Sequence, residues 1–148
     1  MRAVACRVAR AAVTIDKGER RETGPGLLVL LGVGPDDTQA QAERLAAKLL
    51  ELRIFSNADG KFDHSVKDVK GELLVISQFT LYGSVKGGRR PDFTGAAKPA
   101  LAEPLYRSFC ALLASSGLRV ATGEFGAHMD VESVNDGPVT LVLDTAAF

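Results

Sequence analysis

The chain has 148 residues, about the size of one domain, and its 18 Lys and Arg residues balance its 18 Asp and Glu residues. A domain that binds nucleic acid by net charge alone needs a clear excess of basic residues, so that class is excluded. A hydrophobic content of 46% and a charged content of 24% also exclude a disordered chain. We expect a single domain over residues 1–148.

The composition also argues against membrane, secreted and metal-binding proteins. The longest stretches without a charged residue, 23–35 and 73–85, are shorter than the about 20 apolar residues of a membrane-spanning helix. Residues 1–15 lack the apolar block of a signal peptide. Cys6 and Cys110 are far apart and, with only two histidines in the chain, form no zinc-ligand spacing. We expect a cytoplasmic protein with free thiols, no metal and no cofactor.

The N-terminal part of the chain has the pattern of β-strands. From Arg2 to Ile15, small and β-branched residues recur at period two with a break in phase at Ala9–Arg10. This pattern predicts one long strand with a β-bulge, because a bulge changes the face that later residues occupy. A turn at Asp16–Glu19 and a short polar strand follow. The apolar run Leu27–Val33 predicts a strand covered on both faces.

Two segments have the pattern of amphipathic helices. Pro35-Asp36-Asp37 opens the first, and we expect one of the two aspartates to be its N-cap. Leucines at 45, 49 and 52 form the apolar stripe of this helix. A second helix follows Pro99, and Gly117 suits its C-terminal end.

Strands outnumber helices in the rest of the chain. Leu73–Phe79, Arg119–Thr122 and Val139–Leu143 each predict a strand, whereas Ala127–Val134 has no clear pattern. Gly83–Asp92 holds three glycines, three basic residues and a proline, which predicts a mobile loop. We therefore expect an α+β fold: one β-rich domain with a mixed or antiparallel sheet, or a barrel-like core, and two main helices.

Two familiar motifs are incomplete in this sequence. Gly32-Val33-Gly34 follows a strand and precedes a helix, but Asp37 stands where a dinucleotide-binding loop needs its third glycine. Its carboxylate would repel a pyrophosphate. Ser77, His128 and Asp130 could be read as a catalytic triad, but Ser77 lacks the flanking glycines of a nucleophile elbow. We reject both interpretations.

The segment Ser77-Gln78-Phe79-Thr80-Leu81-Tyr82 places hydroxyl and amide groups where a strand runs into a glycine-rich loop. Strand ends hold polar groups rigidly at the mouths of pockets. The alternative is a strand with a polar solvent face. In the loop that follows, Lys86, Arg89 and Arg90 either bind phosphates or are simply solvated.

A second segment, Asn135-Asp136-Gly137-Pro138, has two interpretations as well. Gly137 has no Cβ atom and precedes a proline, so this dipeptide is suited to present main-chain groups to a ligand, and an X-Pro bond is sometimes cis. The alternative is an ordinary turn before the Val139–Leu143 strand.

Together, Ser77-Gln78-Phe79-Thr80 and the stretch from Asn135 to Thr140 resemble the two signature motifs of D-aminoacyl-tRNA deacylases. Both motifs occur in order in a chain of matching length, and the resemblance spans essentially the whole chain. Other matching segments are Arg7-Val8, Gly26–Val33, Arg53-Ile54-Phe55, Arg90-Pro91-x-Phe93 and Phe125–Met129.

The resemblance implies a homodimeric hydrolase that cleaves the ester between a D-amino acid, or glycine, and the terminal adenosine of tRNA. Gly137 and Pro138 of one subunit, joined by a cis peptide bond, would enter the pocket of the other and act as a chiral checkpoint. The resemblance further implies that the Ser77–Thr80 segment lines the ester and adenosine site, with Phe125 and Met129 nearby.

The resemblance also implies an RNA-assisted mechanism, in which the ribose 2′-hydroxyl of the substrate helps the attack. Thr80 is the alternative nucleophile, but the sequence shows no base beside it, and a threonine hydroxyl needs one. Backbone donors near Gln78 and Phe79 are candidates for binding the developing oxyanion. Two other classes of function remain as alternatives: a non-catalytic nucleic-acid-binding dimer, which would depend on Lys86, Arg89 and Arg90, and a structural dimerisation domain.

Overall fold

The computed structural model describes residues 1–148, and its sheet is organised by the long first strand, β1 (Arg2–Ile15). Strands β2 (Glu19–Thr23) and β3 (Gly26–Gly32) pair antiparallel with different halves of one edge of β1. Strand β8 (Met129–Asp144) pairs antiparallel along nearly the whole opposite edge. The register of β1 with β8 shifts on both sides of Val8, which confirms the predicted bulge near this point.

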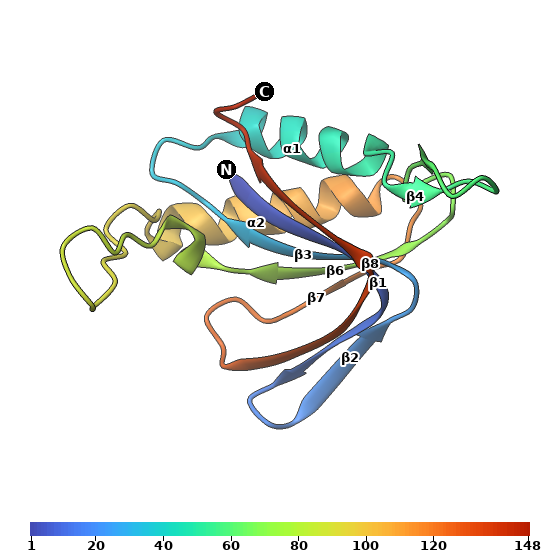
Figure 1. Cartoon of the computed structure of the whole chain (residues 1–148). Coiled ribbons are helices and arrows are strands. Elements are labelled where there is room, and N and C mark those ends of the chain that lie inside the picture. The colour runs from blue at the N-terminus through green and yellow to red at the C-terminus, as the bar shows by residue number, and fades with distance from the viewer.

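Two further strands make the sheet mixed. β6 (Glu72–Ser77) runs parallel to β3, and β7 (Val120–Thr122) runs parallel to β6. The result is a six-stranded, strongly curled sheet in which the β1–β2 hairpin bends away from the helices (Figure 1). A separate small hairpin joins β4 (Phe55–Ser56) and β5 (Phe62–His64). The expected α+β architecture is confirmed.

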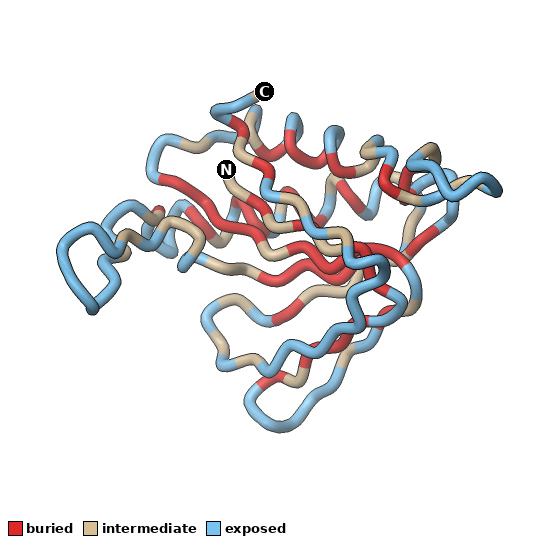
Figure 2. Tube along the Cα trace, in the orientation of Figure 1, coloured by how far each residue is buried: buried red, intermediate tan, exposed pale blue.

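Helices α1 (Gln39–Glu51) and α2 (Pro99–Ala114) cover one face of the sheet, and the main hydrophobic core lies between the helices and this face (Figure 2). Val29 and Leu31 of β3 point into this core, whereas Leu28 packs into a smaller cluster on the other face. This arrangement explains the uninterrupted apolar run of β3, because both of its faces are buried. No helix in the structure has the length and apolarity needed to cross a membrane.

The predicted N-cap of α1 is wrong. Thr38, not Asp36 or Asp37, caps the helix: its side chain accepts a hydrogen bond from the backbone, and the Gln41 side chain bonds back to the Thr38 N–H. This reciprocal pair is a capping box. Asp37 instead accepts hydrogen bonds from Gly34 N–H and from the α-ammonium group of Met1.

Two predicted strand boundaries also differ from the structure. The strand expected over Leu73–Phe79 ends at Ser77, because the chain turns into a 3-10 helix, η1 (Phe79–Tyr82). Asn135–Pro138 is not a turn between two strands. Val8 pairs with Asn135 and Cys6 with Thr140, so residues 136–139 bulge out of one continuous strand, β8. The unassigned stretch Ala127–Val134 contains the start of this strand.

Candidate active site

A cavity of about 570 Å³ opens where β3 and β6 end beside the N-terminal half of α2. Its buried part is apolar and includes Leu31, Val33 and Ala102. Its more exposed part includes the polar side chains of Ser77 and Gln78. A concave apolar site with a few polar groups at its mouth is the usual form of a small-molecule site.

The local fold explains why Ser77 and Gln78 lie at this mouth. Ser77 pairs with Leu31 as the last residue of β6, and the Gln78 N–H makes one more bond to the Leu31 carbonyl at 2.7 Å. The chain then coils into η1, which leaves Phe79 and Thr80 exposed. The Gln78 side-chain amide donates to the Thr80 hydroxyl. Thr80 itself lies beside the cavity and does not line it.

Aromatic rings flank the cavity on two sides. Phe79 and Phe93 meet edge to face, with their ring centroids 5.1 Å apart. Tyr106 and Phe125 lie 6.0 Å apart by the same measure, and the Tyr106 hydroxyl donates to the Val75 carbonyl at 2.8 Å. Burial raises the pKa of Tyr106 above its ordinary value, so this ring stays neutral. Phe79 is exposed and Phe93 and Phe125 are half-buried, so these three rings offer apolar faces on which a nucleobase can stack, whereas Tyr106 is buried.

Gly137 and Pro138 are joined by a cis peptide bond, as the resemblance implied, and both are exposed. Neither residue lines the cavity of its own chain. The bulge lies beside Val8, whose partner is Gly26 at the start of β3, whereas the cavity lies at the end of β3. From Gly26 to Gly32, at about 3.3 Å per residue, these two levels of the sheet are about 20 Å apart.

Arg7 holds the base of this bulge. The residue is only 8% exposed; Nε donates to the Asp136 carbonyl at 3.0 Å and Nη1 to the Ile54 carbonyl at 2.6 Å. The Asp136 carboxylate lies 3.3 Å from Nε and compensates the charge. Arg7 belongs to the matching segment Arg7-Val8, but its position in a strand does not indicate which carbonyl groups it binds.

The other predicted site residues divide between the cavity and its surroundings. Phe125 lines the cavity, but Met129 packs under Gly123 in the smaller apolar cluster. The basic residues Lys86, Arg89 and Arg90 are exposed on the loop that follows η1 and form no ion pair within the chain. This loop projects from the body of the molecule beside the cavity end of the sheet (Figure 1).

Several lining residues were missed by the sequence analysis. Phe93, Thr94 and Lys98 come from the connection before α2, and Tyr106 comes from α2 itself. Phe93 belongs to the matching segment Arg90-Pro91-x-Phe93, so the resemblance contained a signal for it. For Tyr106 the only signal was its place on an apolar helix face, which is equally typical of a core residue.

Nothing near the cavity has the chemistry of a nucleophilic cysteine or a metal centre. Burial raises the pKa of Cys110 to about 11, so its thiol is protonated at neutral pH and is a poor nucleophile. The structure brings together no group of three or more His, Cys, Asp or Glu side chains that could hold a metal ion.

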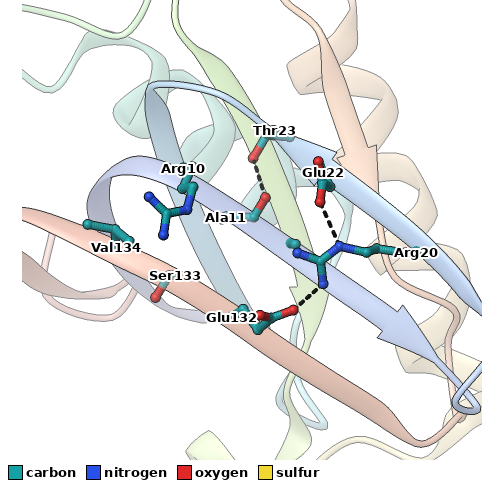
Figure 3. A pocket seen from close by; sticks show the side chains of 9 residues that line it. Arg10, Ala11, Arg20, Glu22, Thr23, Glu132, Ser133 and Val134 are labelled. Carbon is teal, nitrogen blue, oxygen red and sulfur yellow. Dashed lines mark hydrogen bonds and ion pairs between the residues drawn. The ribbon is translucent and has the colours of Figure 1, made fainter.

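A second hollow, of about 190 Å³, lies over β1, β2 and β8 (Figure 3). Arg20 crosses it and bonds to Glu22, at 2.6 Å, and to Glu132. The only other charged group that lines this hollow is Arg10. Two carboxylates neutralise the Arg20 charge, so we interpret the side chains of this hollow as a cross-strand ion-pair network and not as a ligand site.

Comparison with known proteins decides the family. Residues 4–144 match the family model described as D-Tyr-tRNA(Tyr) deacylase. The chain belongs to this family. The D-aminoacyl-tRNA deacylase of Deinococcus radiodurans is 56% identical over 97% of this chain and 99% of its own length. That of Herpetosiphon aurantiacus is 53% identical over 99% of this chain and 95% of its own.

The fold of this deacylase-family chain also matches a solved structure. The c-Myc DNA unwinding element binding protein superimposes with a TM-score of 0.89, at 43% sequence identity, over 97% of this chain and 98% of that chain. The likeness therefore covers nearly the whole fold.

Proposed function

We propose that this protein hydrolyses the ester bond of D-aminoacyl-tRNA, and of glycine carried on tRNA, to release the free amino acid and the tRNA. The observation that carries the proposal is the placing of Ser77, Gln78 and Phe79 at the mouth of an aromatic cavity. Family membership supports the reaction. In this proposal, the cavity receives the terminal adenosine and its ester. We place this activity in the cytoplasm, without a metal or cofactor.

The second part of the proposal is that two copies of the chain form the complete site. Gly137 and Pro138 are exposed at one level of the sheet, and the cavity opens at another. One chain therefore does not bring its own Gly137 to its own cavity. In a homodimer, the Gly137-Pro138 bulge of one subunit enters the cavity of the other.

This arrangement gives a physical basis for chiral selection. Main-chain carbonyls of the bulge bind the α-amino group of the substrate, and a D side chain then points toward solvent. An L side chain would point into the backbone of the bulge and clash with it. Rejection by clash accepts many D side chains, and it accepts glycine because glycine has no side chain to reject.

For the chemical step, we propose that the ribose 2′-hydroxyl of the tRNA assists the attack of water. A threonine nucleophile needs a base that accepts its proton, but the group bonded to the Thr80 hydroxyl is the donating amide of Gln78. The Gln78 N–H is already bonded to Leu31, so it is not free to bind an oxyanion. The N–H of Phe79 has no partner within η1 and is the better candidate.

The deciding experiment compares hydrolysis of D-Tyr-tRNA and L-Tyr-tRNA at equal, sub-saturating enzyme. We expect rapid loss of the D ester while the L ester persists as long as it does in buffer alone. Hydrolysis of both esters would keep the hydrolase and contradict the checkpoint at Gly137 and Pro138. Hydrolysis of neither ester, nor of Gly-tRNA, would favour the alternative of a non-catalytic nucleic-acid-binding dimer.

A further inference from the structure

The turn η1 packs closely against Gly32, the last residue of β3, and against Gly34 just after the strand. A Cβ atom on Gly32 would lie 3.1 Å from the Gln78 carbonyl oxygen, and one on Gly34 would lie 2.9 Å from the Tyr82 ring. Both distances are shorter than ordinary van der Waals contact. Gly32-Val33-Gly34 does not fit the dinucleotide-binding pattern. Its two glycines have no side chains, and this allows the Gln78–Tyr82 segment to pack against them.

Tyr82, the last residue of η1, is held from two sides. Its hydroxyl donates to Asp37 Oδ2 at 3.3 Å, and the guanidinium of Arg2 lies 4.5 Å from the ring centroid. Arg2 also donates from Nη1 to the Leu81 carbonyl at 3.2 Å. Burial, and then the nearby Asp37 carboxylate, raise the pKa of Tyr82 above its ordinary value, so the hydroxyl remains a donor.

Asp37 is itself fixed by strong donors. Its Oδ2 accepts from the Gly34 N–H at 2.6 Å, and its Oδ1 accepts from the Met1 α-ammonium at 2.5 Å. Its side chain is only 11% exposed. Helix capping does not account for this carboxylate, because Thr38 caps α1.

We propose that Asp37 is a positioning residue for the hydrolysis: acting through Tyr82, it holds η1 so that Gln78–Thr80 stay aligned at the mouth of the cavity. This inference rests on the proposed deacylase function of that segment. Asp37 and Tyr82 do not line the cavity, so they act through the backbone. The connection is short, since Leu81 N–H bonds to the Gln78 carbonyl at 3.2 Å and Gly83 N–H to the Thr80 carbonyl at 2.9 Å.

The test uses Tyr82→Phe, which removes one hydroxyl without changing the ring, and Asp37→Asn, which removes the charge. Two quantities are measured for the full chain: the single-turnover rate and tRNA affinity with D-Tyr-tRNA, and hydrogen–deuterium exchange of the 78–83 backbone. We expect the rate to fall about tenfold, in line with the effect of small misplacements of reacting groups, while tRNA affinity is unchanged. Exchange at Leu81 and Gly83 becomes faster.

The matched control is Ser65→Ala, which also removes a hydroxyl bonded to a carboxylate. The Ser65 hydroxyl donates to Asp68 at 2.8 Å, and neither residue lines the cavity, so neither the rate nor exchange at η1 should change. Unchanged exchange in both Tyr82→Phe and Asp37→Asn overturns the inference, whether or not the chain is a hydrolase. Faster exchange with an unchanged rate overturns the role in hydrolysis. If the wild-type chain has no deacylase activity, the proposed function is overturned, and so is the role of Asp37 in hydrolysis. In that case, faster exchange in the two variants would still show that Asp37 supports η1.

Discussion

Arg7 and Asp136 are separated by 129 residues in the chain, yet the Arg7 Nε–H donates to the Asp136 carbonyl at 3.0 Å. The same guanidinium donates to the carbonyl of Ile54 at 2.6 Å. One buried side chain therefore fixes the residue before Gly137 and ties it to the connection that follows α1. The geometry of the exposed bulge therefore depends on Arg7, which is buried and does not line the cavity.

Arg7→Lys tests this support. A lysine has no planar fork, so at least one of the two carbonyls loses its donor, which costs about 1–3 kcal/mol. We expect a lower denaturation midpoint and poorer discrimination between D-Tyr-tRNA and L-Tyr-tRNA. Arg10→Lys is the control, because Arg10 is exposed and makes no hydrogen bond or ion pair, and its change should stay within about 0.5 kcal/mol. Equal discrimination in wild type and Arg7→Lys would argue against a role for Arg7 in the checkpoint.

Gly137→Ala should damage the bulge directly. Gly137 has φ +130°, and an added Cβ would lie 2.8 Å from Val139 Cγ2 and 2.9 Å from Arg7 Nη2. The strained backbone alone costs about 1–3 kcal/mol. Gly60→Ala is the control, because Gly60 also has positive φ, at +76°, but has no neighbour within 4 Å of the added atom. Both variants lose stability, whereas only Gly137→Ala loses hydrolysis of D-Tyr-tRNA; near wild-type kinetics in Gly137→Ala would contradict the checkpoint.

Thr80→Ala should retain substantial activity, within about tenfold of wild type in single-turnover rate. The reason is that Thr80 lies outside the cavity lining and has a donor rather than a base beside its hydroxyl. Rates are measured at saturating enzyme, together with the affinity for tRNA. A loss of several orders of magnitude at unchanged affinity would restore the nucleophile hypothesis.

The exposed basic loop should contribute to tRNA affinity through charge. Combined substitution of Lys86, Arg89 and Arg90 by alanine should lower the slope of log affinity against log salt by about 2, taking about 0.7 per phosphate contact. Substitution of Arg44 and Lys48, on the exposed side of α1, is the control and should leave the slope unchanged. If the triple variant keeps the wild-type slope, the loop is solvated and does not contact the phosphates.

Acid should destabilise the fold partly through Glu72. A hydrogen bond from the Gly24 N–H, and then one from Arg119, hold the pKa of Glu72 below its ordinary value of 4.5. A carboxyl whose pKa is lower in the folded state stabilises the fold above its unfolded pKa, and that contribution is lost as the pH falls through the folded value. We expect the melting temperature of wild type to fall below about pH 4.5 and the dependence to be shallower in Glu72→Gln. If the melting temperatures of wild type and Glu72→Gln depended on pH in the same way, Glu72 would have no part in the acid destabilisation.

The sequence predicts those parts of the fold that depend on local patterns. The long bulged β1, the doubly covered β3 and the two helices follow from periodicity, and all are present. Helix capping was less predictable, because Asp37 and Thr38 are both good N-cap residues. In the structure, Asp37 instead accepts hydrogen bonds from the Met1 ammonium group and the Gly34 N–H, and the contact with Met1 is not encoded in a local pattern.

The site was predictable only where the family motifs cover it. Ser77, Gln78, Phe79 and Phe125 do line the cavity. The separation of Gly137 from that cavity, and the support that Arg7 gives it, arise from the register of β1 with β8, which no local pattern encodes. Met129 illustrates the same limit, because it packs against the smaller apolar cluster and not in the cavity.

The pairing of β1 with β8 has a consequence for how the protein folds. Arg2 and Asp144, 142 residues apart, are cross-strand neighbours. The first strand to be synthesised therefore forms this pairing only after the last strand has been synthesised. Contacts of such large sequence separation slow folding, because the chain must close a long loop before they form. Until then, one edge of β1 has no partner and is open to pairing with another chain. The segment that completes the sheet is also the one that carries Gly137 and Pro138, so the bulge takes its native place only when the sheet is complete.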